Sequence, residues 1–74
     1  MTDKIFFEDL CDAFELEHAI CGSEVLAEAA WWDSMNMLIF ISIMDSRYHR
    51  PIDIDTLANA RTANDLYSLA TRDD

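Results

Sequence analysis

Apolar residues recur at helical spacing between residues 5 and 16. The acidic residues of this segment fall mostly on the opposite side, which is typical of an amphipathic helix with one buried face. The apolar stripe holds Ile5, Phe6, Leu10 and Phe14, with Ala13 at its edge, and the acids are Glu8, Asp9, Asp12 and Glu15. Thr2 and Asp3 are both candidates for the N-cap. The pattern predicts a first helix over residues 5–16.

Residues 17–32 carry mixed signals. Gly22 is the only glycine of the chain, and with Ser23 after it the pair indicates a turn. Residues 23–47 contain neither Gly nor Pro, so helix propensity alone allows one long helix there. However, Asp33 and Ser34 form a helix-start signal directly before a dense apolar run. We therefore predict a loop, with at most a short helical turn inside it, and a break at Asp33.

The following segment, SMNMLIFISIMDSR over residues 34–47, is apolar on nearly every side. Its central part, residues 38–43, also suits a buried strand. The length of the segment and the capping Asp33 favour a helix that is either central or carries an exposed apolar patch. Pro51 ends this element, because the residue before a proline disfavours helix.

The last third of the chain predicts one short and one longer helix. Ile52 and Ile54 alternate with two acids in an extended linker, and Asp55 is a candidate cap for a brief turn over residues 56–58. The residues TAND at 62–65 resemble a capping box with Asp in place of Glu. A final helix follows, ending near Arg72, with Leu66, Leu69 and Ala70 inward and Tyr67 beside them.

These elements predict an all-α fold for a single domain over residues 1–74: a small four-helix bundle with three longer helices and one short. The 74 residues leave room for one domain, and 51% hydrophobic against 27% charged residues is a globular balance. One Gly and one Pro are too few for the turns of a β-sandwich.

The net charge of the chain indicates which classes of partner are expected. Five Lys and Arg against fifteen Asp and Glu give a net charge of −10, which repels phosphate backbones and anionic lipid. We therefore expect no nucleic acid and no membrane as partners, but a basic protein surface. The absence of a basic and apolar leader, and of an apolar run of about 20 residues, predicts a soluble cytoplasmic protein, and we expect a monomer.

Asp33, Ser34 and Met35 form the one local pattern that points to chemistry. With Asp33 as N-cap, the Ser34 hydroxyl lies in the first turn and faces solvent. An anionic group attached to it would meet the positive end of the helix dipole. Taken alone, an Asp-Ser pair is most often a plain helix cap.

The order of elements along the chain favours a functional role for Ser34 over a plain helix cap. An amphipathic first helix, a long loop, WDSM opening an apolar second helix and TANDL opening the last helix together resemble an acyl carrier protein. The resemblance covers about the whole chain, although only WDSM and its spacing to TANDL are specific. It implies that a 4′-phosphopantetheine arm is attached to Ser34. It also implies that Asp33 orients the helix start and helps to position the metal used when this arm is transferred to the serine.

The resemblance further implies a stand-alone carrier that holds an acyl or aminoacyl group as a thioester, in fatty acid or secondary metabolite biosynthesis. Such a protein is not an enzyme. Its partners are a phosphopantetheinyl transferase and an acyl-activating ligase or synthase with a basic and apolar docking surface.

The second helix departs from the pattern of fatty acid carriers, which show acids along its exposed side. Here that stretch offers an apolar partner surface, with acids from its surroundings and from the linker: Met35, Ile39, Asp45, Asp53 and Asp55. This points to a specialised carrier of a dedicated pathway. A simpler interpretation is that Ile39 packs under the loop.

Two other interpretations are weaker. A non-catalytic acidic interaction module of the same fold, with an unmodified serine, explains the charge equally well. Cys11, His18 and Cys21 match no zinc-finger spacing, so we expect no metal site.

Overall fold

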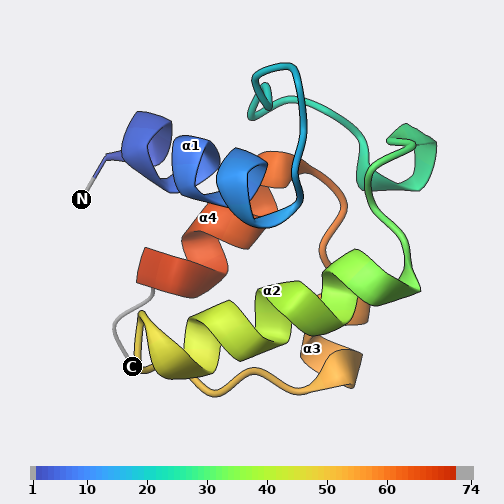
Figure 1. The fold of residues 1–74 in the computed structure, drawn as a ribbon. Helices are drawn as coiled ribbons and strands as arrows, with labels where there is room; N and C mark the ends of the chain where they lie inside the picture. The colour runs from blue at the N-terminus through green and yellow to red at the C-terminus, as the bar shows by residue number, and fades with distance from the viewer. Residues whose placement is uncertain (1, 72–74) are drawn as a thin grey trace.

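The computed structural model describes residues 2–71, which form four α-helices and one short 3-10 helix (Figure 1). These are α1 (Asp3–Ala13), η1 (Leu26–Glu28), α2 (Ser34–Ser46), α3 (Ile54–Ala58) and α4 (Ala63–Thr71). The predicted all-α class, with three longer helices and one short, is confirmed for these residues. The strand alternative for residues 38–43 is wrong, because all of them are helical.

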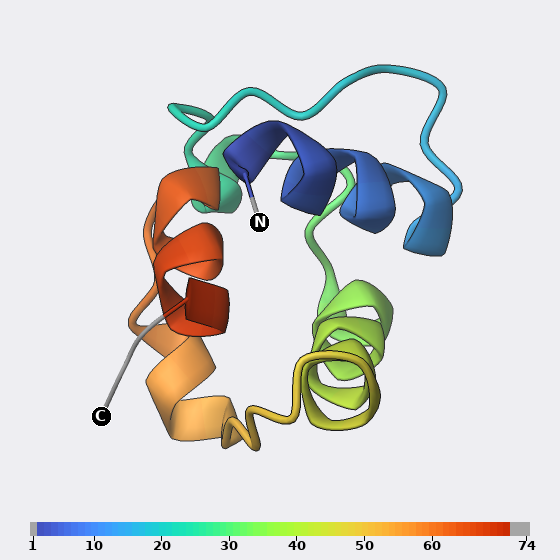
Figure 2. The same ribbon diagram turned by 90° about the vertical axis from the view of Figure 1, so that its left-hand side faces the viewer.

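Each helix contributes to one apolar core. α1 lies at one end of the molecule and α3 at the other, with α2 and α4 on either side between them (Figure 2). The largest fully buried side chains come from all four helices: Phe6, Leu10, Phe40, Met44, Leu57 and Leu66. Full burial of such a side chain stabilises the fold by about 1.5–3 kcal/mol. No helix among residues 2–71 has both the length and the apolar character needed to span a bilayer.

α1 begins and ends earlier than the predicted range of residues 5–16. Thr2 is its N-cap, with the Thr2 side chain accepting a hydrogen bond from the Ile5 amide at 3.3 Å. At the other end Glu15 takes a left-handed backbone conformation (φ 56°), and the Leu16 amide bonds back to the Cys11 carbonyl at 2.9 Å. These features make a Schellman motif, which stops the helix before Leu16.

The buried face of α1 is rotated from the predicted stripe. Ile5 is 58% exposed, whereas Phe7 is only 7% exposed. The difference arises because the segment between α1 and α2 arches over α1 and covers the Phe7 side (Figure 2). A periodic pattern identifies a helix but does not say which of its edges a loop will cover.

The long loop is docked on the start of α4. The Ala63 amide donates to the Glu24 carbonyl (3.0 Å) and the Asn64 amide to the Gly22 carbonyl (2.8 Å), so two free amides of α4 are satisfied by the loop. A Cβ at Gly22 would overlap the Asn64 side chain, so a larger residue there would require that side chain to move. The short helical turn predicted inside the loop is present as η1.

Two capping predictions in the last third differ in outcome. The cap of α3 is Asp53, whose side chain accepts a hydrogen bond from the Thr56 amide at 2.7 Å, so the prediction of Asp55 is wrong and Asp55 lies in the first turn. In the predicted capping box, the Asp65 carboxylate accepts hydrogen bonds from the amides of Arg61 (2.8 Å) and Thr62 (3.1 Å). These bonds lower the pKa of Asp65. The predicted helix end near Arg72 lies outside the described residues.

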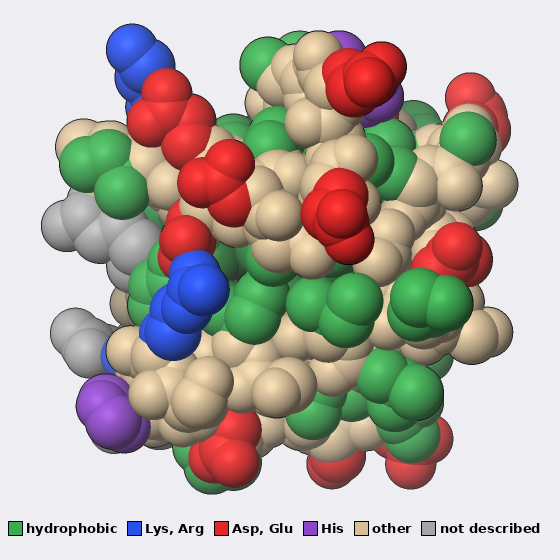
Figure 3. All heavy atoms as spheres, viewed as in Figure 1, with side chains coloured by type: hydrophobic (Ala, Val, Ile, Leu, Met, Phe, Trp, Pro, Cys, Tyr) green, Lys and Arg blue, Asp and Glu red, His purple; other side chains and the backbone are tan. Residues whose placement is uncertain are grey.

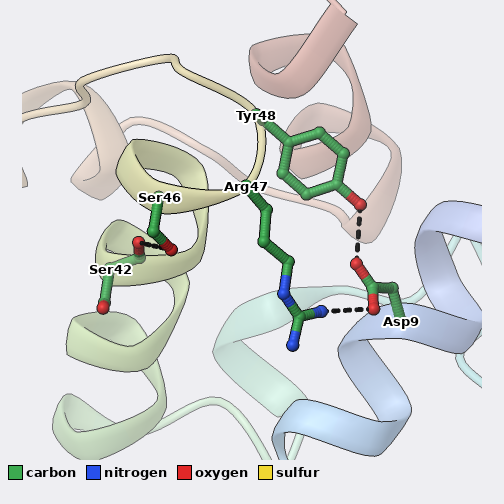
Figure 4. Close-up of polar contacts among 5 residues, drawn as sticks. All are labelled: Asp9, Ser42, Ser46, Arg47 and Tyr48. Carbon is green, nitrogen blue, oxygen red and sulfur yellow. Dashed lines mark hydrogen bonds and ion pairs between the residues drawn. The ribbon is translucent and has the colours of Figure 1, made fainter.

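One polar cluster ties α1 to the end of α2 (Figure 4). Arg47 forms an ion pair with Asp9, and the Tyr48 hydroxyl donates to the other oxygen of the same carboxylate at 2.8 Å. Directly before Arg47, the Ser46 hydroxyl donates to the Ser42 carbonyl one turn back in α2, at 2.9 Å. The Asp9 carboxylate therefore fixes the C-terminal end of α2 against α1.

Candidate functional site

The candidate site is the first turn of α2. Asp33 has an extended backbone and its carboxylate accepts a hydrogen bond from the Asn36 amide at 2.9 Å, which makes Asp33 the N-cap as predicted. The Met37 amide donates to the Asp33 carbonyl at 2.9 Å and closes the first helical turn. Ser34 is the first helical residue and its side chain is exposed. The hydroxyl is thus presented to solvent from a helix start whose position is fixed.

A chain of hydrogen bonds connects this turn to the loop before it. The Asn36 side-chain amide donates to the Trp31 carbonyl (2.6 Å), and the Trp31 indole donates to Glu24 (2.9 Å). The other Glu24 oxygen accepts from the Cys21 amide at 3.0 Å. The bonds from Cys21 and Trp31 lower the pKa of Glu24, so this carboxylate is charged at neutral pH and holds the loop.

Aromatic packing fixes the residues directly before Ser34. The ring of Trp31 stacks on Phe14 with centroids 5.8 Å apart, and Trp32 and Phe40 pack in a T-shaped arrangement with centroids 5.9 Å apart. Trp31 is 7% exposed and belongs to the core. Because Phe14 follows α1 and Phe40 belongs to α2, the two tryptophans anchor the Ser34 end of α2 to the rest of the fold.

One predicted partner residue does not lie where the sequence placed it. Met35 is exposed, as expected, but Ile39 is partly buried and packs against the core. Leu38, and not Ile39, is the exposed apolar residue next to Met35: 64% of Leu38 is exposed, against 69% of Met35. Ile39 thus packs against the core, which does not test whether it lies under the loop.

The exposed face of α2 therefore combines apolar and polar side chains, with Ser34 at its start. We call it the α2 face, and its exposed members are Ser34, Met35, Leu38, Ser42, Asp45 and Ser46. Hydrophobic side chains gather over the N-terminal half of α2 in Figure 3, and acidic side chains line the edge below them. Helical spacing from Met35 to Leu38 was the signal that would have identified Leu38.

The predicted acids Asp45, Asp53 and Asp55 are all exposed. They come from two elements: Asp45 belongs to the last turns of α2, whereas Asp53 and Asp55 lie at the start of α3. Asp53 has a structural task as well, because hydrogen bonds from Thr56 lower its pKa and keep it charged. Near α2, the chain thus offers carboxylates beside an apolar patch.

The two cysteines and His18 have other contacts. The Cys11 thiol donates to the His18 carbonyl at 3.3 Å, and the Cys21 thiol lies 3.2 Å from the Ser23 hydroxyl. Hydrogen bonds from Ser23 lower the pKa of the Cys21 thiol. Within residues 2–71 no three His, Cys, Asp or Glu side chains are grouped so that they could hold a metal ion.

Comparison of the chain with protein-family models, with curated proteins and with solved structures finds no match.

Proposed function

We propose that this protein is a stand-alone carrier that holds an acyl or aminoacyl group as a thioester on a 4′-phosphopantetheine arm attached to Ser34. The observation that carries the proposal is the exposed Ser34 hydroxyl at the first position of α2, directly after a capping aspartate. The resemblance of WDSM and TANDL to acyl carrier proteins agrees with this geometry. In this proposal the chain is no enzyme, is monomeric and works in the cytoplasm.

The residues around Ser34 fit an attached phosphodiester. An anionic group joined to the hydroxyl is favoured at a helix N-terminus, by about 0.3–1 kcal/mol at an exposed position. The neighbouring Asp33 side chain accepts the hydrogen bond from the Asn36 amide and so fixes the helix start next to the hydroxyl. When bound, the arm supplies the thiol that carries the thioester.

A carrier needs a rigid attachment point more than it needs a catalytic pocket. Here Asn36, Trp31 and Glu24 form the hydrogen-bond chain that holds the loop on the first turn of α2. The Ser34 backbone is thereby kept in one place while an attached arm is free to reach successive active sites. These residues have a positioning role and do not contact the cargo.

The α2 face suggests the chemistry of the partners. Met35 and Leu38 offer exposed apolar area directly beside Ser34, and Asp45 adds negative charge on the same helix. A phosphopantetheinyl transferase, and an acyl-activating ligase or synthase, would meet this face with an apolar patch next to basic residues. Apolar contact then contributes affinity, and charge steers the encounter.

The test is intact-mass analysis after incubation with coenzyme A and a phosphopantetheinyl transferase. We expect one phosphopantetheine mass to be gained by the wild-type chain and by Ser42→Ala, and no gain in Ser34→Ala. Ser42 is a matched control because it is an exposed serine of the same helix. Absence of any gain with several transferases would contradict the carrier and favour an acidic interaction module with an unmodified serine.

A further inference from the structure

A second surface of the molecule combines an apolar floor with an acidic rim. A hollow of about 510 Å³ lies between α1 and the loop segment 16–22. We call it the α1 groove: its apolar side chains are Phe7, Cys11, Leu16 and Ile20, and its acidic ones are Asp3, Glu8, Asp12 and Glu17. In Figure 3, hydrophobic side chains are visible between α1 and the loop, with acidic side chains around them.

The α1 groove is separate from the Ser34 site. At 3.6 residues per turn, Phe7, Glu8 and Cys11 lie on one side of α1 and Asp9 lies on the opposite side. Asp9 is the residue that pairs with Arg47 at the end of α2. The groove therefore opens on the face of α1 turned away from α2, and no residue of α2 lines it.

The charge of the rim is not neutralised within the described chain. The groove is also lined by Lys4 and His18, but no side chain of residues 2–71 forms an ion pair with Glu8, Asp12 or Glu17. Four carboxylates against one lysine leave a strongly negative rim. Such a rim attracts cations and repels nucleic acid and anionic lipid.

We propose that the α1 groove docks a cationic amphipathic segment of a partner protein. An apolar side chain of that segment would cover the floor at Phe7 and Ile20, and its Lys or Arg side chains would pair with Glu8 and Asp12. This inference goes beyond the carrier proposal, because it needs neither the Ser34 hydroxyl nor the arm. A partner bound there would leave the α2 face open to a second protein.

The experiment uses the full chain and a synthetic helical peptide with one leucine face and one lysine face, followed by isothermal titration calorimetry. We expect the double variant Glu8→Gln/Asp12→Asn to weaken binding about five- to tenfold. The control Glu15→Gln/Glu28→Gln removes the same charge from exposed positions that do not line the groove and should change the affinity less than about twofold. All four side chains are exposed, so circular dichroism should show unchanged helix content.

The two cysteines provide an independent readout. Cys11 lies in the α1 groove, whereas Cys21 is exposed outside it. Bound peptide should slow alkylation of Cys11 while leaving the rate at Cys21 unchanged. Equal weakening in both double variants, an unprotected Cys11, or no binding of the peptide overturns the inference. The variant Ser34→Ala should bind the peptide as the wild type does, so failure of the carrier proposal remains distinguishable from failure of this one.

Discussion

Tyr48 shows how a single side chain is adjusted by its surroundings. The pKa of Tyr48 is raised to about 12. Partial burial is the largest cause, and the hydrogen bond from the hydroxyl to the Asp9 carboxylate and the charge of that carboxylate add to it. The ordinary value of this pKa is 10.0. The unfolded chain therefore releases this proton at lower pH than the folded chain, and the bond contributes to stability only while the phenol is protonated.

We predict that the free energy of unfolding is lost in part between about pH 10 and pH 12, the interval between the unfolded and folded pKa values of Tyr48. Below pH 10 the contribution is fully present. Urea unfolding followed over this range should give a flatter profile for Tyr48→Phe than for the wild type. Parallel profiles for the two proteins would show that the bond to Asp9 contributes nothing.

A second prediction at the residue scale concerns the cap of α2. Asp33→Ala should lower the free energy of unfolding by about 1 kcal/mol, because the Asn36 amide loses its acceptor. Asp33→Asn keeps an acceptor at the same place and should cost less. Asp45→Ala, an exposed acid without a capping role, should stay within about 0.5 kcal/mol of the wild type in the same urea titration.

At the level of elements, α2 divides its apolar residues between the core and solvent. Phe40, Ile43 and Met44 are buried, whereas Met35 and Leu38 are exposed on the α2 face. Replacing an exposed apolar residue leaves the core intact, so function and stability can be separated on this helix.

We predict that Met35→Ser and Leu38→Ser each reduce kcat/KM for transfer of phosphopantetheine by roughly three- to tenfold, mainly through KM, since contacts made on docking are lost. Their free energies of unfolding should change by less than about 0.5 kcal/mol. Ile5→Ser is the matched control, because Ile5 is 58% exposed on α1, another element. A control variant as slow as the other two would disprove docking on the α2 face.

Local signals in the sequence predicted the elements better than their faces. The cap at Asp33 and the box at Asp65 were predicted because each rests on a few adjacent residues, and Thr2 was one of two candidates for the first cap. The buried edge of α1 and the inward position of Ile39 were not, because both depend on what packs against the helix. In the same way, Asp53 and Asp55 are equivalent as local signals, and only the structure shows that Asp53 bonds the Thr56 amide.

The candidate site could be predicted only in part, because some of its contacts are local in sequence and others are not. Ser34 and its cap are local, whereas the contacts among Glu24, Trp31 and Asn36 link residues from both sides of the break at Asp33. Sequence spacing gives no hint that a loop glutamate supports the helix start through an indole. Likewise, the α1 groove requires the loop to fold back over α1.

For the whole molecule, the net charge of −10 is the dominant electrostatic feature. Fifteen acidic residues repel one another in the compact state, which lowers the stability of the fold. Salt at about 0.1 M reduces the range of these interactions to roughly 10 Å.

We therefore predict that raising NaCl from about 10 mM to about 0.3 M increases the free energy of unfolding, as measured by thermal and urea denaturation. A Glu28→Lys variant, which brings the net charge from −10 to −8 at an exposed loop position, should gain less from the added salt. A fall in stability with salt would mean that attractive pairs, such as Arg47 with Asp9, outweigh the repulsion.

The two tryptophans of the chain precede Ser34 by three and two positions. Trp31 is buried and its indole is bonded to Glu24, while Trp32 is partly buried beside Phe40. Indole emission depends on local polarity and on nearby charge, and every fluorophore of this type lies at the Ser34 end of α2. We therefore expect attachment of the proposed arm to Ser34 to change the tryptophan emission, which can be followed in real time without any label.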